Sequence, residues 1–118
     1  MERKCFDINN LPDQRICGIY KIISPSGKVY IGQSINIFKR WKSYKNLNCQ
    51  QQTRLYNSLK KYGPESHYFS IILVCEKDLL NLMERSFIGL YKANGLRGLN
   101  TAHSLFQIEQ KKIRALRS

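Results

Sequence analysis

The sequence predicts one small α+β domain, in which a mainly antiparallel three-stranded sheet is flanked by helices. Its 118 residues allow a single domain with one modest core. Two β-rich segments joined by a turn lie within residues 17–32, and a nearly continuous apolar run of strand length follows at 67–75. Segments of helical character separate and follow these strands, so helices and strands are expected to pack in one mixed architecture.

The first two strands are predicted to form a β-hairpin. The segments CGIYKII and KVYIG are rich in β-branched and aromatic residues, and SPSG between them is a turn cluster. A three-residue turn places Ser24 opposite Lys28 and Ile22 opposite Tyr30. Because side chains alternate along a strand, Tyr20 and Tyr30 then project from one face of the hairpin.

The other elements follow in order along the chain. Ser34 or Asn36 can cap a helix, and Gly63-Pro64 ends another. The run HYFSIILVC indicates a central strand that is buried on both faces. We expect residues 16–102 to form the domain. An N-terminal extension over 1–15 is expected to precede it, and a basic C-terminal helix over 103–118 is expected to follow it. Within it, the predicted elements after the hairpin are the capped helix running to about Leu47, a helix over 51–62, a strand over 67–75 and a helix over 77–93.

The charge of the chain is strongly positive and unevenly distributed. There are 20 Lys and Arg against 8 Asp and Glu, which gives a formal net charge of +12. Residues 14–64 hold ten of the basic residues and no acidic one. This distribution favours a polyanionic partner, most commonly nucleic acid. The residues expected to contact its phosphates are Lys28, Lys39, Lys42, Lys45, Arg54, Lys60 and Lys61.

Other classes of protein fit the sequence poorly. No apolar run is long enough for a transmembrane helix, and the N-terminus lacks the apolar region of a signal peptide. The four cysteines are scattered and the two histidines lie far apart, which argues against a zinc site. We therefore expect an intracellular protein with free thiols and no membrane partner.

Glu84 occupies an unusual position, on the apolar face of the predicted 77–93 helix. Leu80 and Ile88 lie four residues before and after it, on the same face. A carboxylate there is costly unless it is paired, hydrogen-bonded or bound to a metal. Glu84 therefore serves a site, forms a salt bridge with Arg85 or Arg40, or lies at the rim of a slightly rotated stripe.

Tyr20, Tyr30 and Arg40 each allow two interpretations. Gly18 and Gly32 flank the tyrosines, which indicates a close approach of backbone. The two rings either serve a site or pack as cross-strand aromatics over a core. Arg40 precedes the only tryptophan and lies about 100° around the helix from it. Its guanidinium either binds a phosphate or is solvated on an exposed face.

The tripeptides GIY at 18–20 and YIG at 30–32 resemble, letter for letter, the signature of the GIY-YIG nucleases. Arg40 falls where that family has its arginine, and Glu84 falls where it has its metal-binding glutamate. Asn100, in the sequence GLNT, resembles the asparagine near the end of the family's domain. The resemblance implies a GIY-YIG-like fold of the homing-endonuclease type.

The same resemblance implies a metal-dependent DNA endonuclease that hydrolyses phosphodiester bonds. Glu84 would bind one divalent metal, Mg²⁺ or Mn²⁺, and Tyr20 would be the general base for the attacking water. Tyr30 would orient the water or the phosphate, and Arg40 would stabilise the transition state. Asn100 would hold Tyr20 or Glu84 in place.

The chain departs from the family in two ways. Tyr44 stands where many members carry histidine, so more of the proton transfer falls on Tyr20 and Tyr44. Many homing members also attach a separate DNA-recognition region, whereas only the basic segment 103–118 follows here. We expect double-stranded DNA as the partner, branched or at a specific site, together with a homodimer or a separate specificity partner. The alternative is a nucleic-acid-binding domain of the same fold that cuts weakly or not at all.

Overall fold

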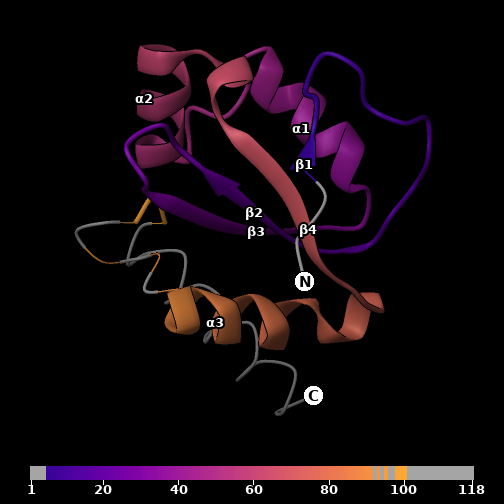
Figure 1. Cartoon of the computed structure of the whole chain (residues 1–118). Helices are drawn as coiled ribbons and strands as arrows, with labels where there is room; N and C mark the ends of the chain where they lie inside the picture. The colour runs from indigo at the N-terminus through magenta and orange to yellow at the C-terminus, as the bar shows by residue number, and fades with distance from the viewer. Residues whose placement is uncertain (1–4, 92, 94, 96–97, 101–118) are drawn as a thin grey trace.

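An antiparallel sheet divides the domain into two helical layers (Figure 1). The computed structural model describes residues 5–91, 93, 95 and 98–100. Helices α1 (Ile37–Lys45) and α2 (Thr53–Tyr62) lie on one side of the sheet, and α3 (Leu80–Tyr91) lies on the other. The strands, in the spatial order β1-β4-β2-β3, are β1 (Cys5–Phe6), β4 (Tyr68–Val74), β2 (Gly18–Ile23) and β3 (Val29–Ser34).

The predicted hairpin is confirmed with its register. Ile22 lies opposite Tyr30, and the backbone N–H of Ser24 donates to the carbonyl of Lys28 over 2.9 Å. Gly27 closes the turn with φ +85°, a left-handed conformation that favours glycine. Tyr20 therefore lies directly opposite Gly32, and Tyr20 and Tyr30 share one face of the sheet.

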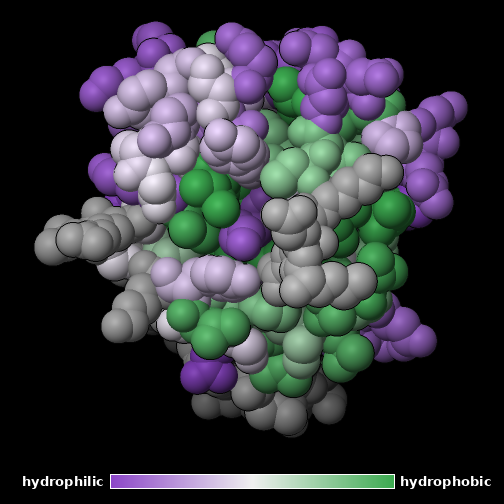
Figure 2. Space-filling model, viewed as in Figure 1, coloured by the Kyte–Doolittle hydropathy of each residue, from purple (hydrophilic) through white to green (hydrophobic). Residues whose placement is uncertain are grey.

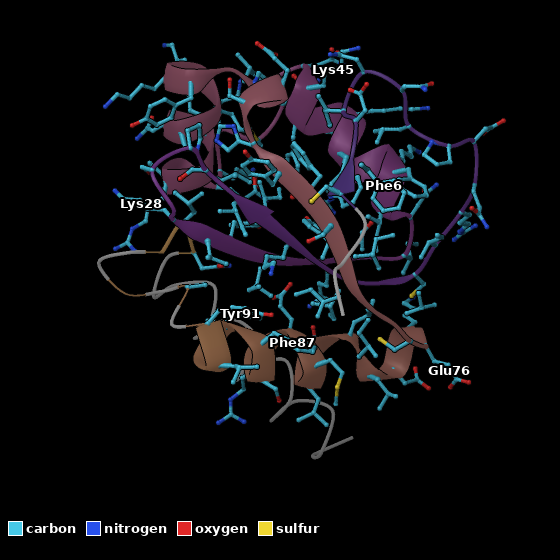
Figure 3. The ribbon with its side chains drawn as sticks, viewed as in Figure 1. Phe6, Lys28, Lys45, Glu76, Phe87 and Tyr91 are labelled. Carbon is cyan, nitrogen blue, oxygen red and sulfur yellow. The ribbon has the colours of Figure 1, made fainter. Side chains whose placement is uncertain are left out.

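The predicted three strands are joined by a fourth, β1, which pairs with β4 at the edge of the sheet. This strand falls within the predicted N-terminal extension. Phe6 holds it against α1, with ring centroids 5.1 Å from Phe38 and 5.5 Å from Trp41 (Figure 3). Two paired residues are too short to show the alternation that marks a strand, so tertiary packing rather than local pattern forms β1.

Two apolar clusters hold the layers together, one on each face of the sheet. The first surrounds Trp41 of α1, which is fully buried and packs edge-on against Tyr20 and Phe69. The second lies between the sheet and α3, and it contains Ile19 and Ile88. Figure 3 shows Phe87 and Tyr91 on the sheet-facing side of α3. Because each strand presents alternate side chains to the two clusters, the sheet is the shared wall of both cores.

The helix ends follow the predicted signals with one difference. The side chain of Asn36 caps α1 by accepting from the backbone N–H of Lys39 over 3.3 Å, and Gly63 ends α2 with φ +86°. The predicted 77–93 helix is divided, because Lys77–Leu79 form a separate 3₁₀ turn before α3 begins. A second 3₁₀ turn covers Pro64–Ser66. The predicted C-terminal helix lies outside the described residues.

Hydrophilic side chains gather over the side of the molecule formed by α1 and α2 (Figure 2). The residues of these two helices that the sequence predicts to contact nucleic acid are all exposed: Lys39, Lys42, Lys45, Arg54, Lys60 and Lys61. Within the described ranges, no helix has the length and apolarity that crossing a membrane requires.

Candidate active site

Three tyrosines from three different elements meet in one buried cluster. Tyr20 comes from β2, Tyr30 from β3 and Tyr44 from α1, and none of them is more than 7% exposed. The hydroxyl groups of Tyr20 and Tyr44 share a short hydrogen bond. The ring centroids of Tyr20 and Tyr30 lie 6.3 Å apart, and those of Tyr30 and Tyr44 lie 6.4 Å apart. Hence the two hairpin tyrosines are cross-strand core aromatics and also bring their polar ends to one place.

Gly32 makes room for this arrangement. A Cβ atom at position 32 would lie 2.6 Å from Cε1 of the Tyr20 ring and would overlap the phenol end of the ring as well. Only glycine therefore lets the Tyr20 side chain cross β3 at this point. Gly18 has a comparable role toward β4, because a Cβ there would lie 3.0 Å from the carbonyl carbon of Leu73. Gly32 is thus a steric requirement of the tyrosine cluster, and Gly18 is a steric requirement of the close pairing of β2 with β4.

Glu84 and Arg40 act on the tyrosines through their charges. Glu84 of α3 is only 8% exposed, so it lies inside the packed face rather than at its rim. Its carboxylate raises the pKa of Tyr20 and of Tyr30. Arg40 is exposed on α1, and its guanidinium lowers the pKa of all three tyrosines. The cluster therefore lies within the electrostatic field of one carboxylate and one guanidinium.

Burial dominates the ionisation of the tyrosine cluster. Loss of solvent is the largest cause that raises the pKa of Tyr20, Tyr30 and Tyr44 well above the ordinary value. Hydrogen bonding shifts the balance among them, because the bond with Tyr44 lowers the pKa of Tyr20 and the bond with Tyr30 lowers that of Tyr44. All three are consequently neutral phenols at neutral pH, and a phenolate at Tyr20 needs further stabilisation.

Comparison with known proteins identifies the family. Residues 16–100 match the GIY-YIG catalytic domain. The chain belongs to the GIY-YIG nuclease family. The structure is similar to the solved catalytic domain of the intron endonuclease I-TevI in a mutant form, with a TM-score of 0.65 and 31% identity over 74% of this chain and 94% of that chain. The catalytic domain of the homing endonuclease I-TevI gives a TM-score of 0.61 and 32% identity over 73% and 98% of the two chains. No curated protein sequence matches the chain.

Asn100 bonds to the backbone of β3 in this GIY-YIG nuclease domain. Its side-chain oxygen accepts from the backbone N–H of Ile31 over 2.7 Å, and its side-chain nitrogen donates to the carbonyl of Ile31 over 2.7 Å. These bonds hold β3 between Tyr30 and Gly32, and that Asn100 holds Tyr20 or Glu84 in place stays a prediction. The Asn100 side chain thus hydrogen-bonds the N–H and C=O groups of Ile31 at the edge of the sheet, as a neighbouring strand would.

Arg54 has a structural contact that the sequence did not predict. It donates from Nη1 to the carbonyls of Gly95 over 2.9 Å and Asn100 over 3.0 Å. This guanidinium therefore joins α2 to the backbone that carries Asn100. These two bonds occupy one nitrogen of the guanidinium, and the predicted DNA contact of Arg54 stays a prediction.

The remaining predicted DNA-binding residues fall into separate groups. Lys39 and Lys42 line one hollow beside α1, and Lys42 and Lys45 line another. Lys28 and Lys61 line a third hollow together with Arg54. Lys60 instead lies over the ring of Tyr56, with its nitrogen 5.9 Å from the ring centroid. The basic stretch of the sequence thus forms several local surfaces in the fold.

Glu84 offers a divalent metal one buried carboxylate as a ligand. Within the part of the chain that the structure describes, no group of three or more His, Cys, Asp or Glu side chains could hold a metal. Glu84 would then be the protein carboxylate, with water and substrate phosphate as the other ligands. Mg²⁺ is commonly held in this way, by one or two carboxylates and the oxygens of a phosphate. A carboxylate donor is compatible with Mg²⁺ or Mn²⁺.

Proposed function

We propose that the chain is a metal-dependent DNA endonuclease that hydrolyses phosphodiester bonds, and that the tyrosine cluster with Glu84 and Arg40 is its catalytic centre. The observation that carries the proposal is the convergence of three buried tyrosines, one carboxylate and one guanidinium in a GIY-YIG domain. The catalytic domain of an intron endonuclease with 31% identity and the same fold supports it.

Tyr20 is the proposed general base, and Tyr44 stabilises its charged form. The hydroxyls of Tyr20 and Tyr44 share a hydrogen bond, and with Tyr44 as its donor this bond stabilises a phenolate at Tyr20. A phenolate at Tyr20 can take the proton of the attacking water as its oxygen bonds to phosphorus. Tyr44, where many relatives have histidine, serves as the hydrogen-bond donor that lowers the pKa of Tyr20 and so favours its phenolate.

Glu84 is the proposed ligand of Mg²⁺ or Mn²⁺. The bound ion would supply Lewis-acid stabilisation of the charge that develops on the phosphate oxygens. Glu84 raises the pKa of Tyr20, so neutralising its charge removes one of the causes that oppose phenolate formation. A buried carboxylate beside phenols thereby gains a chemical reason for its position.

Arg40 and Tyr30 act on the phosphate. Arg40 is exposed on α1, so its guanidinium can donate two parallel hydrogen bonds to a phosphate and offset the charge of the transition state. Tyr30 lies 7% exposed beside Tyr20, where its hydroxyl can orient the water or the phosphate. These two residues hold the scissile group against the base.

The proposal is tested by incubating supercoiled plasmid with the wild-type protein in Mg²⁺, in Mn²⁺ or in EDTA. Cutting should require the metal. Arg40→Ala should lower the cutting rate about 10²- to 10³-fold, the usual cost of losing one transition-state donor, while DNA binding persists. Lys77→Ala, which removes an exposed cation at the start of the 3₁₀ turn before α3, is the matched control.

A specific outcome would favour the alternative function. If the wild-type protein binds double-stranded and branched DNA but cuts neither with either metal, the chain is a nucleic-acid-binding domain of this fold. The neutral, deeply buried phenols are the feature consistent with that alternative.

A further inference from the structure

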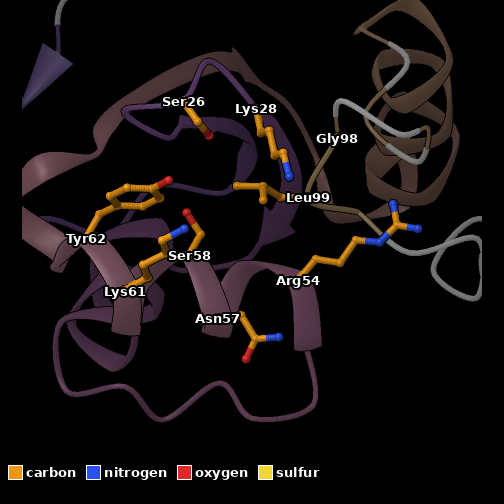
Figure 4. A pocket seen from close by; sticks show the side chains of 9 residues that line it. All are labelled: Ser26, Lys28, Arg54, Asn57, Ser58, Lys61, Tyr62, Gly98 and Leu99. Atoms are coloured by element: carbon orange, nitrogen blue, oxygen red, sulfur yellow. The ribbon is translucent and has the colours of Figure 1, made fainter.

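We infer a second phosphate-binding site, formed by the pocket between the β2–β3 turn and α2, which holds a backbone phosphate of the DNA strand bound at the tyrosine cluster. The inference rests on the proposed function and adds a place of contact to it. The pocket has a volume of about 360 Å³. Its walls include Ser26, Lys28, Arg54, Asn57, Lys61 and Tyr62 (Figure 4).

The charge of the pocket selects an anion. Lys28 comes from the turn immediately before β3, whereas Arg54 and Lys61 come from α2. None of the described residues that line the pocket is acidic. Ser26 and Asn57 add uncharged groups that can donate hydrogen bonds. Three cations around one hollow therefore favour a phosphate over a neutral ligand.

Two of these cations are already held in position. Arg54 is fixed by its bonds to the carbonyls of Gly95 and Asn100, 2.9 and 3.0 Å long. The Lys61 nitrogen lies over the ring of Tyr62, 5.2 Å from the centroid. Figure 4 shows Arg54 directed toward the backbone around Gly98 and Leu99. Charges held in this way lose less conformational entropy when a ligand binds.

The floor of the pocket adds no charge that would oppose an anion. Ser58 lines the pocket, and its hydroxyl lies 2.7 Å from Nε2 of His67. The other ring nitrogen, Nδ1, lies 2.8 Å from the carbonyl of Gly63 and donates to it. Nε2 of the neutral ring therefore accepts from Ser58, and burial lowers the pKa of His67. The floor is a satisfied neutral network, so the cations at the walls determine what binds.

The position of the pocket suits the same DNA strand. Lys28 lies two residues before Tyr30 and four before Gly32, against which the Tyr20 ring packs. At about 3.3 Å per residue, these steps correspond to about 7 and 13 Å along β3. One DNA strand presents a phosphate about every 3.4 Å of helix axis. A DNA strand whose axis follows β3 past the tyrosine cluster would bring a phosphate to the pocket two to four nucleotides away, by the same estimate.

The test is the salt dependence of DNA binding. Affinity for a fluorescent duplex is measured in EDTA at several KCl concentrations, for the wild type, for Lys28→Gln/Lys61→Gln and for Lys77→Gln. If both lysines bind one phosphate, the double variant should bind DNA more weakly. The slope of the logarithm of its binding constant against the logarithm of the KCl concentration should be smaller in magnitude by about 0.9. Lys77→Gln should keep the wild-type slope, because Lys77 lies outside the pocket.

Other results would overturn the inference. An unchanged slope in the double variant would exclude a phosphate in the pocket. A decrease of about 1.8 would indicate two independent backbone contacts rather than one site. Lys28 and Lys61 are exposed, so the variants should keep the wild-type melting temperature, and circular dichroism checks this.

The outcome is separable from that of the proposed function, because binding in EDTA does not depend on cutting. If the wild type never cuts and the double variant has a smaller slope, the result supports the phosphate-binding pocket and contradicts the nuclease activity. If the wild type cuts and the double variant has an unchanged slope, the result supports the nuclease activity and contradicts the phosphate-binding pocket.

Discussion

Replacing Tyr44 with phenylalanine removes the hydroxyl that bonds to Tyr20 and keeps the buried ring. A hydrogen bond to a charged group contributes about 1.5–3 kcal/mol. Because about 1.4 kcal/mol corresponds to one pKa unit, the pKa of Tyr20 should rise by about one to two units. Below that pKa the phenolate fraction falls tenfold per unit, so Tyr44→Phe should cut about 10- to 100-fold more slowly and its pH–rate profile should shift to higher pH.

The assay is single-turnover nicking of supercoiled plasmid between about pH 6 and pH 9.5. Tyr44→His tests the chemistry, since an imidazole can also donate and should recover part of the rate. Tyr68→Phe is the matched control, because that ring is 58% exposed and outside the tyrosine cluster. A Tyr44→Phe profile that superimposes on the wild-type profile, at an unchanged melting temperature, would refute the donor role of Tyr44.

Three further predictions concern the support of the site. Gly32→Ala should abolish cutting, because the added carbon overlaps the Tyr20 ring; wild-type nicking by this variant would contradict the steric argument. Asn100→Ala leaves the N–H and C=O of Ile31 without their side-chain partner, so the urea-derived free energy of unfolding should fall by about 2–5 kcal/mol. A loss below about 0.5 kcal/mol would show that the edge of β3 does not need it. The pKa values of the three buried tyrosines are raised, so the folded state keeps their protons above about pH 10, where the unfolded chain loses them. The free energy of unfolding should therefore be unaffected by these groups below about pH 10 and should fall above it by up to about 1.4 kcal/mol per pH unit for each group. Tyr20→Phe should make this alkaline decline shallower, and an identical decline would contradict the assignment.

Local features of the fold were predictable, whereas tertiary ones were not. Turn length and side-chain alternation determine the hairpin register, so the pairing of Ile22 with Tyr30 followed from the sequence. The strand Cys5–Phe6 did not follow, because two residues show no pattern and the contacts of Phe6 with α1 stabilise them. The division of the 77–93 helix is the exception among the local features, because apolar spacing does not distinguish a 3₁₀ turn from the first turn of an α-helix.

The site shows the same division. The spacing placed Glu84 on an apolar helix face and left open whether it is buried or lies at the rim, and the structure shows that it is buried. The hydrogen bond between Tyr20 and Tyr44 depends on how α1 docks on the sheet, which no local pattern specifies. The contacts of Arg54 and Asn100 likewise join segments more than 40 residues apart in sequence. Ser26, Asn57 and Tyr62 of the second pocket carried no signal, because only the fold brings the turn and α2 together.

The cutting rate of Glu84→Gln in Mg²⁺ tests the central claim most directly. The substitution keeps the size of the side chain and removes the charge that would hold the metal, and Glu76→Gln removes an exposed carboxylate outside the cluster as the control. The proposed centre predicts a loss of at least about 100-fold for Glu84→Gln, or about 2.7 kcal/mol of transition-state stabilisation, and no loss for Glu76→Gln. If Glu84 acted only by raising the pKa of Tyr20, its removal would favour the phenolate. An equal or faster rate for Glu84→Gln would therefore contradict the account.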